Sequence, residues 1–224
     1  MNLWQDFLTN DDRLIHKWMH YFDVYHRHFE RFRDRPVTLV EFGVYHGTST
    51  SCMHAARAES KSSHTMRLFG FDSFEGLPST AANEDDGVWA PGLFSSSIEF
   101  TRSNLRRWGV PDDDVTLIKG WFSDSLTEHT RVEHDIRHVG VAMIDCDLHS
   151  STQTVLAFLA PLVHRRAIFV FDDWDSSNLG ERGLGEARAF REFLDANPEL
   201  SASEIPGLNY KTKPGPRVFL IARN

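Results

Sequence analysis

Hydrophobic and polar positions along this 224-residue chain follow two alternating periods. In some segments apolar residues recur every three or four positions, as on one face of a helix, and in others they form short continuous runs, as in buried strands. Such an alternation is typical of parallel strands joined by crossover helices. The pattern therefore predicts an α/β fold.

The individual elements can be placed from these periods. Strands are predicted at 37–42, 67–71, 115–118, 139–144 and 168–171, and helices at 48–59, 96–108, 151–163 and 185–195. The continuous apolar runs indicate strands that are covered on both faces. We expect a Rossmann-like, doubly wound, mostly parallel sheet.

The two ends of the chain add to this core. Apolar residues at helical spacing predict an amphipathic helix over 11–33, so residues 1–35 are expected to form an N-terminal helical segment packed on a single domain of residues 36–224. Near the C-terminus, segments 209–212 and 217–222 are separated by Lys-Pro-Gly-Pro, which is too short for a crossover helix. This spacing predicts an antiparallel hairpin, giving seven strands in all.

Composition narrows the classes of partner. With 32 acidic and 24 basic residues the formal charge is −8, and a nucleic-acid partner is not expected because phosphate binding needs a concentrated basic surface. Cys52 and Cys146 show no C-x-x-C spacing, and neither a signal peptide nor a membrane span is predicted. We expect a soluble, cytoplasmic protein that acts on a small molecule, with a homo-oligomer possible through the aromatic N-terminal helix.

Acidic residues follow two of the predicted strands. Asp145 and Asp147 come after 139–144, and Asp172 and Asp173 come after 168–171. Carboxylates at neighbouring strand ends repel one another unless a cation lies between them, and carboxylate oxygens suit Mg²⁺ or a similar divalent ion. We predict a metal site formed by Asp145, Asp172 and Asp173.

The turn after the first strand indicates the cofactor. It reads Glu41-Phe-Gly43-Val-Tyr-His-Gly47-Thr-Ser49, which is not the G-x-G-x-x-G spacing that holds a pyrophosphate. The glycines allow a ligand to approach the backbone, the Thr48 and Ser49 hydroxyls can cap the following helix, and the acid suits a ligand with a positive charge.

The acid at the end of the second strand, Asp72, suits ribose hydroxyls, and the combination points to S-adenosylmethionine. Trp121, at the third strand end, is expected near the adenine. The predicted cofactor-binding residues are Glu41, Gly43, Tyr45, Gly47, Thr48, Ser49, Asp72, Ser73, Trp121 and Asp145.

One long irregular segment, 76–95, follows the second strand. Such a length inside a compact domain is typical of a lid or binding loop. Trp89 and Phe94 within it can stack on an acceptor ring or anchor the loop to the domain.

Four blocks of the sequence resemble the macrocin O-methyltransferase family. They are Val40-Glu-Phe-Gly-Val-Tyr-His-Gly-Thr-Ser49, Phe71-Asp-Ser-Phe-Glu-Gly-Leu-Pro78, Ile144-Asp-Cys-Asp-Leu-His-Ser-Ser-Thr152 and Phe171-Asp-Asp-Trp174. The resemblance covers about residues 37 to 195. It implies a seven-stranded class I methyltransferase that uses S-adenosylmethionine and Mg²⁺ to methylate a sugar hydroxyl in natural-product biosynthesis. It also implies cofactor contacts from Glu41, Gly43, Gly47 and Asp72, and the same three metal ligands.

The expected chemistry assigns catalytic roles to Asp145, Asp147 and His149. Methyl transfer to an alcohol needs alignment of the two partners and a more nucleophilic hydroxyl, which a metal at Asp145 and a neighbouring base can provide. Asp147 or His149 is the candidate base. Equally, Asp147 can cap the following helix and His149 can be a surface or supporting residue.

Two other function classes remain open. A Mg²⁺-dependent glycosyltransferase explains Asp145-Cys-Asp147 as a DxD motif but leaves Glu41 and Asp172-Asp173 without a role. A non-catalytic ligand-binding module on the same fold is the third class. An O-methyltransferase accounts for all of these features together.

Overall fold

The structure, a computed structural model, describes residues 37–59, 66–205 and 216–224. Seven strands form one sheet in the order β3-β2-β1-β4-β5-β7-β6. β1 to β5 run parallel, and β7 runs antiparallel to both β5 and β6. This confirms the doubly wound, mostly parallel sheet. The strands are β1 (Val37–Phe42), β2 (Met66–Asp72), β3 (Val115–Lys119), β4 (Val139–Ile144), β5 (Arg166–Phe171), β6 (Leu200–Glu204) and β7 (Arg217–Arg223).

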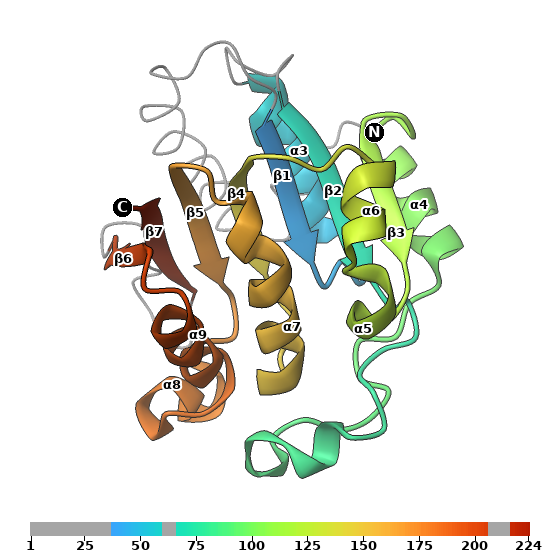
Figure 1. Ribbon diagram of the computed structural model, residues 1–224. Helices are drawn as coiled ribbons and strands as arrows, with labels where there is room; N and C mark the ends of the chain where they lie inside the picture. The colour runs from blue at the N-terminus through green and yellow to red at the C-terminus, as the bar shows by residue number, and fades with distance from the viewer. Residues whose placement is uncertain (1–36, 60–65, 206–215) are drawn as a thin grey trace.

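Helices cover both faces of the sheet (Figure 1). One face carries α3 (Thr48–Glu59) and α4 (Ile98–Arg107). The other carries α5 (Phe122–Ser125), α6 (Glu128–Glu133), α7 (His149–Leu159) and α9 (Gly185–Ala196). The short α8 (Leu179–Arg182) precedes α9, and 3₁₀ turns lie at Ala81–Asn83, Asp85–Gly87, Ala160–Leu162 and Ser176–Asn178. No helix in the ranges described is long and apolar enough to cross a membrane.

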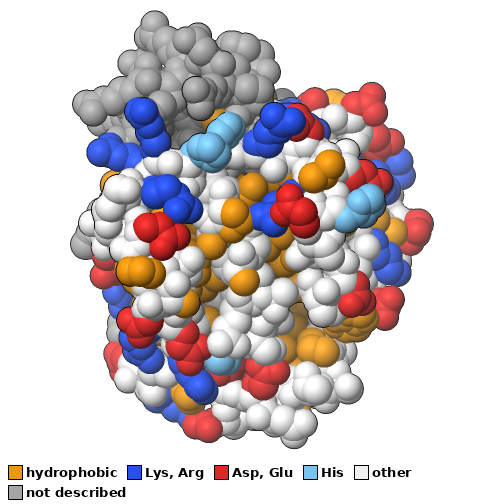
Figure 2. All heavy atoms as spheres, viewed as in Figure 1, with side chains coloured by type: hydrophobic (Ala, Val, Ile, Leu, Met, Phe, Trp, Pro, Cys, Tyr) orange, Lys and Arg blue, Asp and Glu red, His pale blue; other side chains and the backbone are white. Residues whose placement is uncertain are grey.

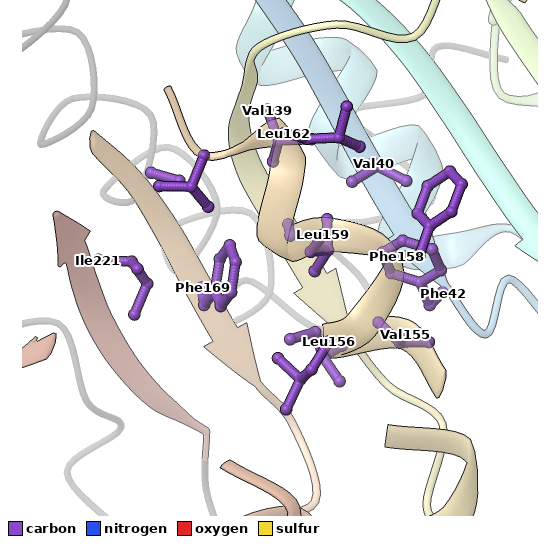
Figure 3. Packing of buried hydrophobic residues seen from close by; sticks show 14 of the residues in the cluster. Val40, Phe42, Val139, Val155, Leu156, Phe158, Leu159, Leu162, Phe169 and Ile221 are labelled. Atoms are coloured by element: carbon purple, nitrogen blue, oxygen red, sulfur yellow. The ribbon is translucent and has the colours of Figure 1, made fainter. Parts of the chain in front are cut away.

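The core divides into two layers because successive strand residues point to opposite faces. In β1, Leu39 packs toward α3 and α4, whereas Val40 and Phe42 pack toward α7. Figure 3 shows the second layer, in which Phe42 and Phe158 lie edge to face with ring centroids 6.2 Å apart. Burial on both sides explains why these strands read as continuous apolar runs.

The sheet ends in an antiparallel pair of C-terminal strands, as predicted, although β6 was not among the predicted strands. Segment 217–222 lies in β7 as expected, but the antiparallel neighbour is β6, with Leu200 opposite Arg223 and Glu204 opposite Phe219. β6 is an edge strand in which only Leu200 is buried, so its hydrophobic pattern is too weak to read from sequence. The predicted strand 209–212 and the predicted N-terminal helix 11–33 lie outside the described residues.

Gly43 sets how closely β1 and β4 approach at their C-terminal ends. Its φ is +92°, and a Cβ atom placed there would lie 1.7 Å from the Asp145 carbonyl oxygen. The sheet hydrogen bonds continue past the strand ends, since Asp145 N donates to Phe42 O at 2.9 Å. Only glycine therefore allows the site residues after β4 to lie against the turn after β1.

We predict that Gly43→Ala unfolds at much lower urea concentration than wild type. Gly92→Ala is the matched control, because Gly92 also has a positive φ, +77°, but has no atom within 4 Å of an added Cβ. In the control, the positive φ of a non-glycine residue lowers the free energy of unfolding by about 1 kcal/mol. Gly43→Ala adds a clash with the backbone and is expected to lower it by more than ~3 kcal/mol. Equal losses in the two variants would show that the close approach does not constrain this turn.

Candidate functional site

A cavity of about 610 Å³ opens at the C-terminal ends of the parallel strands. It lies between the turns that follow β1 and β4, where the strand order reverses direction along the sheet. In open α/β sheets this is where ligands bind, and the volume suits a cofactor-sized molecule. The lining residues are Gly43, Tyr45, Asp72, Ser73, Gly76, Leu77, Pro78, Phe94, Trp121, Phe122, Ser123, Asp145, Cys146, Asp147, Ser150, Ser151, Thr154, Asp172 and Asp173.

The structure brings together six of the ten residues predicted to bind the cofactor. Those that line the cavity are Gly43, Tyr45, Asp72, Ser73, Trp121 and Asp145. The other four, which are Glu41, Gly47, Thr48 and Ser49, are not among the lining residues.

Glu41 is fully buried and faces α3 rather than the cavity. Its two carboxyl oxygens accept hydrogen bonds from the hydroxyls of Ser49 and Thr50 in the first turn of that helix. The sequence predicted that the Ser49 hydroxyl can cap this helix. In the structure it donates to Glu41 instead. Burial raises the pKa of Glu41 to about 8, against the lowering effect of these two hydroxyls.

Asp72 organises two turns at once. Its Oδ2 accepts from the backbone amides of Val44 and Tyr45, both at 2.8 Å, and its Oδ1 accepts from Phe74 N at 2.6 Å. The carboxylate therefore joins the turn after β1 to the turn after β2. Because each carboxylate oxygen has two acceptor sites, Asp72 keeps capacity for a ligand in the cavity.

Carboxyl groups converge on the side of the cavity formed by β4 and β5. Asp145, Asp147, Asp172 and Asp173 all line it, as the sequence predicted. Asp173 Oδ1 accepts a hydrogen bond from Ser176 Oγ at 2.9 Å. Burial, followed by the charge of Asp173, raises the pKa of Asp147 to about 9. Burial and the charge of Asp172 raise the pKa of Asp173 to about 6 and that of Asp145 well above its ordinary value.

A further acid, Glu186 in α9, completes this group and was missed from sequence. Its Oε2 accepts from Asp173 N at 3.0 Å, and burial raises its pKa well above the ordinary value. Glu186 shares the buried face of α9 with Phe190 and Phe193. A charged residue four and seven positions before two buried aromatic residues, and so on the same helix face, was the signal that could have found it.

The oxygen atoms of these acids are of the chemical type that binds a divalent cation. They are carboxylate oxygens whose charges repel one another, and Asp173 Oδ2 and Glu186 Oε1 are buried without a hydrogen-bond partner. Among the residues that the structure describes, however, no group of three or more His, Cys, Asp or Glu side chains is arranged as a metal site.

The two candidate bases are placed differently. Asp147 lines the cavity, with 7% of its surface exposed. The N-cap of α7 is Leu148, so Asp147 does not cap that helix. The His149 ring instead lies against α9, with Nε2 2.8 Å from Glu192 Oε2, and His149 is not a lining residue.

The first turns of α7 supply lining residues that the sequence did not reveal. Ser150, Ser151 and Thr154 face the cavity from a helix that is otherwise largely buried. Polar residues at one- and four-residue spacing in an apolar helix were the available signal.

The 76–95 segment borders the cavity, as expected of a binding loop. Gly76, Leu77, Pro78 and Phe94 line it. Phe94 is 44% exposed and lies edge to face against Tyr45, with ring centroids 5.9 Å apart, and Trp89 lies 6.3 Å from Phe94. These rings form an aromatic mouth to the cavity. Figure 2 shows acidic and basic side chains interspersed on the lower left of the molecule, where α8 and α9 lie in Figure 1.

Comparison with known proteins relates this site to one family. The profile of the macrocin-O-methyltransferase (TylF) family matches residues 30–197. A curated relative from Streptomyces olivaceus is 32% identical over 151 residues, which is 62% of this chain and 53% of that protein. It is an 8-demethyl-8-(2,3-dimethoxy-alpha-L-rhamnosyl)-tetracenomycin-C 4'-O-methyltransferase.

A second relative, the demethyldecarbamoylnovobiocin O-methyltransferase of Streptomyces niveus, is 30% identical over 167 residues, covering 71% of this chain and 61% of that protein. The match thus spans between half and two thirds of each curated relative.

Solved structures share the fold. CalS11, a calicheamicin methyltransferase, has a TM-score of 0.69 at 21% identity, with 98% of this chain and 85% of that chain covered. An O-methyltransferase from Bacillus cereus in complex with SAH has a TM-score of 0.57 at 15% identity, with 97% and 93% covered. At these identities the likeness concerns the fold.

We predict that Glu41 makes the protein less stable as pH rises. The folded chain keeps this carboxyl protonated up to about pH 8, whereas in the unfolded chain it ionises near 4.5. Between these two pH values the folded state binds one more proton than the unfolded state. The contribution of protonated Glu41 to the free energy of unfolding is therefore complete below pH 4.5. It falls by about 1.4 kcal/mol per pH unit as the pH rises toward 8.

Urea unfolding from pH 5 to 8 tests this, with EDTA present and no cofactor. Glu41→Gln should flatten the decline, because the amide mimics the protonated acid, whereas Glu99→Gln, at an exposed site, should not. The same slope in wild type and Glu41→Gln would contradict the assignment.

Proposed function

This chain belongs to the macrocin-O-methyltransferase family, and we propose that it transfers a methyl group from S-adenosylmethionine to a hydroxyl of a sugar or another small natural-product acceptor. The observation that carries the proposal is the cavity itself. It joins Asp72 at the end of β2, which we assign to the ribose, to the acidic group at the ends of β4 and β5.

We assign cofactor contacts to the residues that both were predicted and line the cavity. Gly43 allows the ligand to approach the backbone, Asp72 accepts from the ribose hydroxyls, and Trp121 offers an apolar surface for the adenine. Glu41 acts indirectly in this proposal. By binding Ser49 and Thr50 it fixes the start of α3 and thereby the shape of the turn.

We assign a divalent cation such as Mg²⁺ to Asp145, Asp172 and Asp173. All three acids line the cavity, and burial together with the charges of Asp172 and Asp173 raises the pKa of Asp145. When bound there, the cation would lower the pKa of an acceptor hydroxyl. The unpartnered Asp173 Oδ2 and the mutual repulsion of the carboxylates support this assignment.

Asp147 is the base that we propose. It lines the cavity beside Asp145, whereas His149 does not, and a general base must lie within reach of the proton that it removes. The bond of the His149 ring to Glu192 favours a supporting role for that residue. Asp147 would take the hydroxyl proton as the oxygen attacks the methyl group in line with the departing sulfur.

A sugar-bearing acceptor is supported by the Streptomyces olivaceus relative, a 4'-O-methyltransferase of a rhamnosyl-tetracenomycin. The aromatic mouth of Tyr45, Trp89 and Phe94 is suited to an apolar ring of the acceptor. The family match favours this reading over a DxD glycosyltransferase or a non-catalytic module.

Titration with S-adenosylhomocysteine in a calorimeter tests the cofactor assignment. We expect micromolar binding by wild type and at least tenfold weaker binding by Asp72→Asn, because the amide presents one acceptor oxygen instead of two. Asp112→Asn is the control, since Asp112 pairs with Arg106 on the surface. Failure of wild type to bind, with or without Mg²⁺, would refute the methyltransferase and favour a nucleotide-sugar as ligand.

Steady-state kinetics with a glycoside acceptor and Mg²⁺ test the base. Asp147→Asn should lower kcat by about 10²–10⁴-fold while S-adenosylhomocysteine binding stays within threefold of wild type. His149→Gln should stay within a few-fold of wild type in kcat. A larger loss of kcat in His149→Gln than in Asp147→Asn would identify His149 as the base.

EDTA should abolish turnover and Mg²⁺ should restore it, because the acids alone cannot activate the hydroxyl. Full activity in EDTA would refute the metal while leaving methyl transfer intact. Cofactor binding without turnover of any acceptor would indicate the non-catalytic module.

A further inference from the structure

Two helices that begin next to acids of the site have no side-chain cap of their own. The N-cap residues of α7 and α9 are Leu148 and Leu184, and neither makes a side-chain capping bond. Leucine has no oxygen to accept from the free amides of a first helical turn, and it is among the poorest N-cap residues. The acceptors for these amides must come from elsewhere in the chain.

Asp85 in the 76–95 loop supplies an acceptor to both helices. Its Oδ2 accepts from His149 N at 2.9 Å, and its Oδ1 accepts from Gly185 N at 2.8 Å. Asp85 is 8% exposed, although it belongs to a surface loop. The neighbouring Glu84 adds bonds from Ser150 N at 3.0 Å and Ser150 Oγ at 2.8 Å, but in an exposed setting. A negative charge also suits the positive end of each helix dipole.

The two amides that Asp85 binds lie next to the site. His149 comes two residues after Asp147, and Gly185 comes directly before Glu186, which accepts from Asp173 N. The loop that carries Asp85 also lines the cavity near both of its ends, through Gly76 to Pro78 and through Phe94. One carboxylate therefore joins the loop to both sides of the acidic group.

We propose that Asp85 is a positioning residue, which couples the docking of the 76–95 loop to the placement of Asp147 and Asp173. The inference rests on the proposed function, since it assigns Asp85 a part in methyl transfer. Asp85 touches no reacting atom; it acts through the starts of α7 and α9. Misplacement of a reacting group by about 1 Å can cost about 100-fold in rate.

Asp85→Asn is the informative change. Asparagine keeps the shape of aspartate, but it presents one acceptor oxygen and one amino group. The amino group cannot accept, so one of the two helix amides loses its partner. Glu84→Gln is the matched control, because it alters the adjacent, exposed acid on the same loop.

The first measurement is amide hydrogen exchange, which requires no activity. We expect faster exchange at His149 or Gly185 in Asp85→Asn than in wild type or Glu84→Gln. The second is kinetic: kcat should fall 10- to 100-fold in Asp85→Asn, while the dissociation constant of S-adenosylhomocysteine stays within threefold. A merely structural role would lower both together.

A double variant tests whether Asp85 acts through the base. In an Asp147→Asn background, adding Asp85→Asn should change kcat less than twofold, because residues that act as a unit are not additive. Multiplicative losses would overturn the proposal, as would an unchanged kcat or unchanged exchange at both amides. If Asp85→Asn melts too low for kinetics, Asp85→Glu replaces it, and the same selective loss of kcat is required.

Measurements on wild type distinguish failure of the proposed function from failure of the positioning role of Asp85. If it neither binds S-adenosylhomocysteine nor turns over, the proposed function fails and the positioning role fails with it. If wild type turns over and Asp85→Asn matches it, only the positioning role fails.

Discussion

The rest of the site depends on how buried carboxyl groups are accommodated at one edge of the sheet. Asp145, Asp147, Asp173 and Glu186 converge there, and burial raises the pKa of each. Buried charges of one sign are costly unless protons, hydrogen-bond donors or a cation compensate them. In this chain the Ser176 hydroxyl donates to Asp173, and the Asp173 backbone amide donates to Glu186. The same arrangement supports our proposal of a bound cation and a carboxylate base.

Acids in this protein serve two separate purposes. Asp72 and Asp85 use their oxygens to accept from backbone amides, and in doing so they fix turns and helix starts around the cavity. Asp72 also lines the cavity, together with Asp145, Asp147 and Asp173, whereas Asp85 does not. In our proposal Asp85 thus influences a reacting centre that it does not touch.

The family assignment and the site agree on the kind of chemistry. The family profile covers residues 30–197, which include every residue that lines the cavity. Gly43 lets the turn after β1 approach Asp145 closely, which brings the proposed cofactor region and the acidic region into one cavity. An in-line transfer requires such proximity, because the two partners must be aligned before the hydroxyl attacks.

The sequence by itself determined the parallel sheet and the edge at which the ligand cavity lies. Strand burial is a local property that shows in each apolar run, and Asp72, Asp145 and Asp172 follow such runs directly. Tertiary structure alone decided where other side chains point. Glu41 faces α3, His149 binds Glu192, and Asp85 caps α7 and α9 from 64 and 100 residues away. Those contacts join segments distant in sequence, so no local period records them. Edge strand β6 was not predicted for a local reason: most of its residues are exposed, so it shows little hydrophobic pattern.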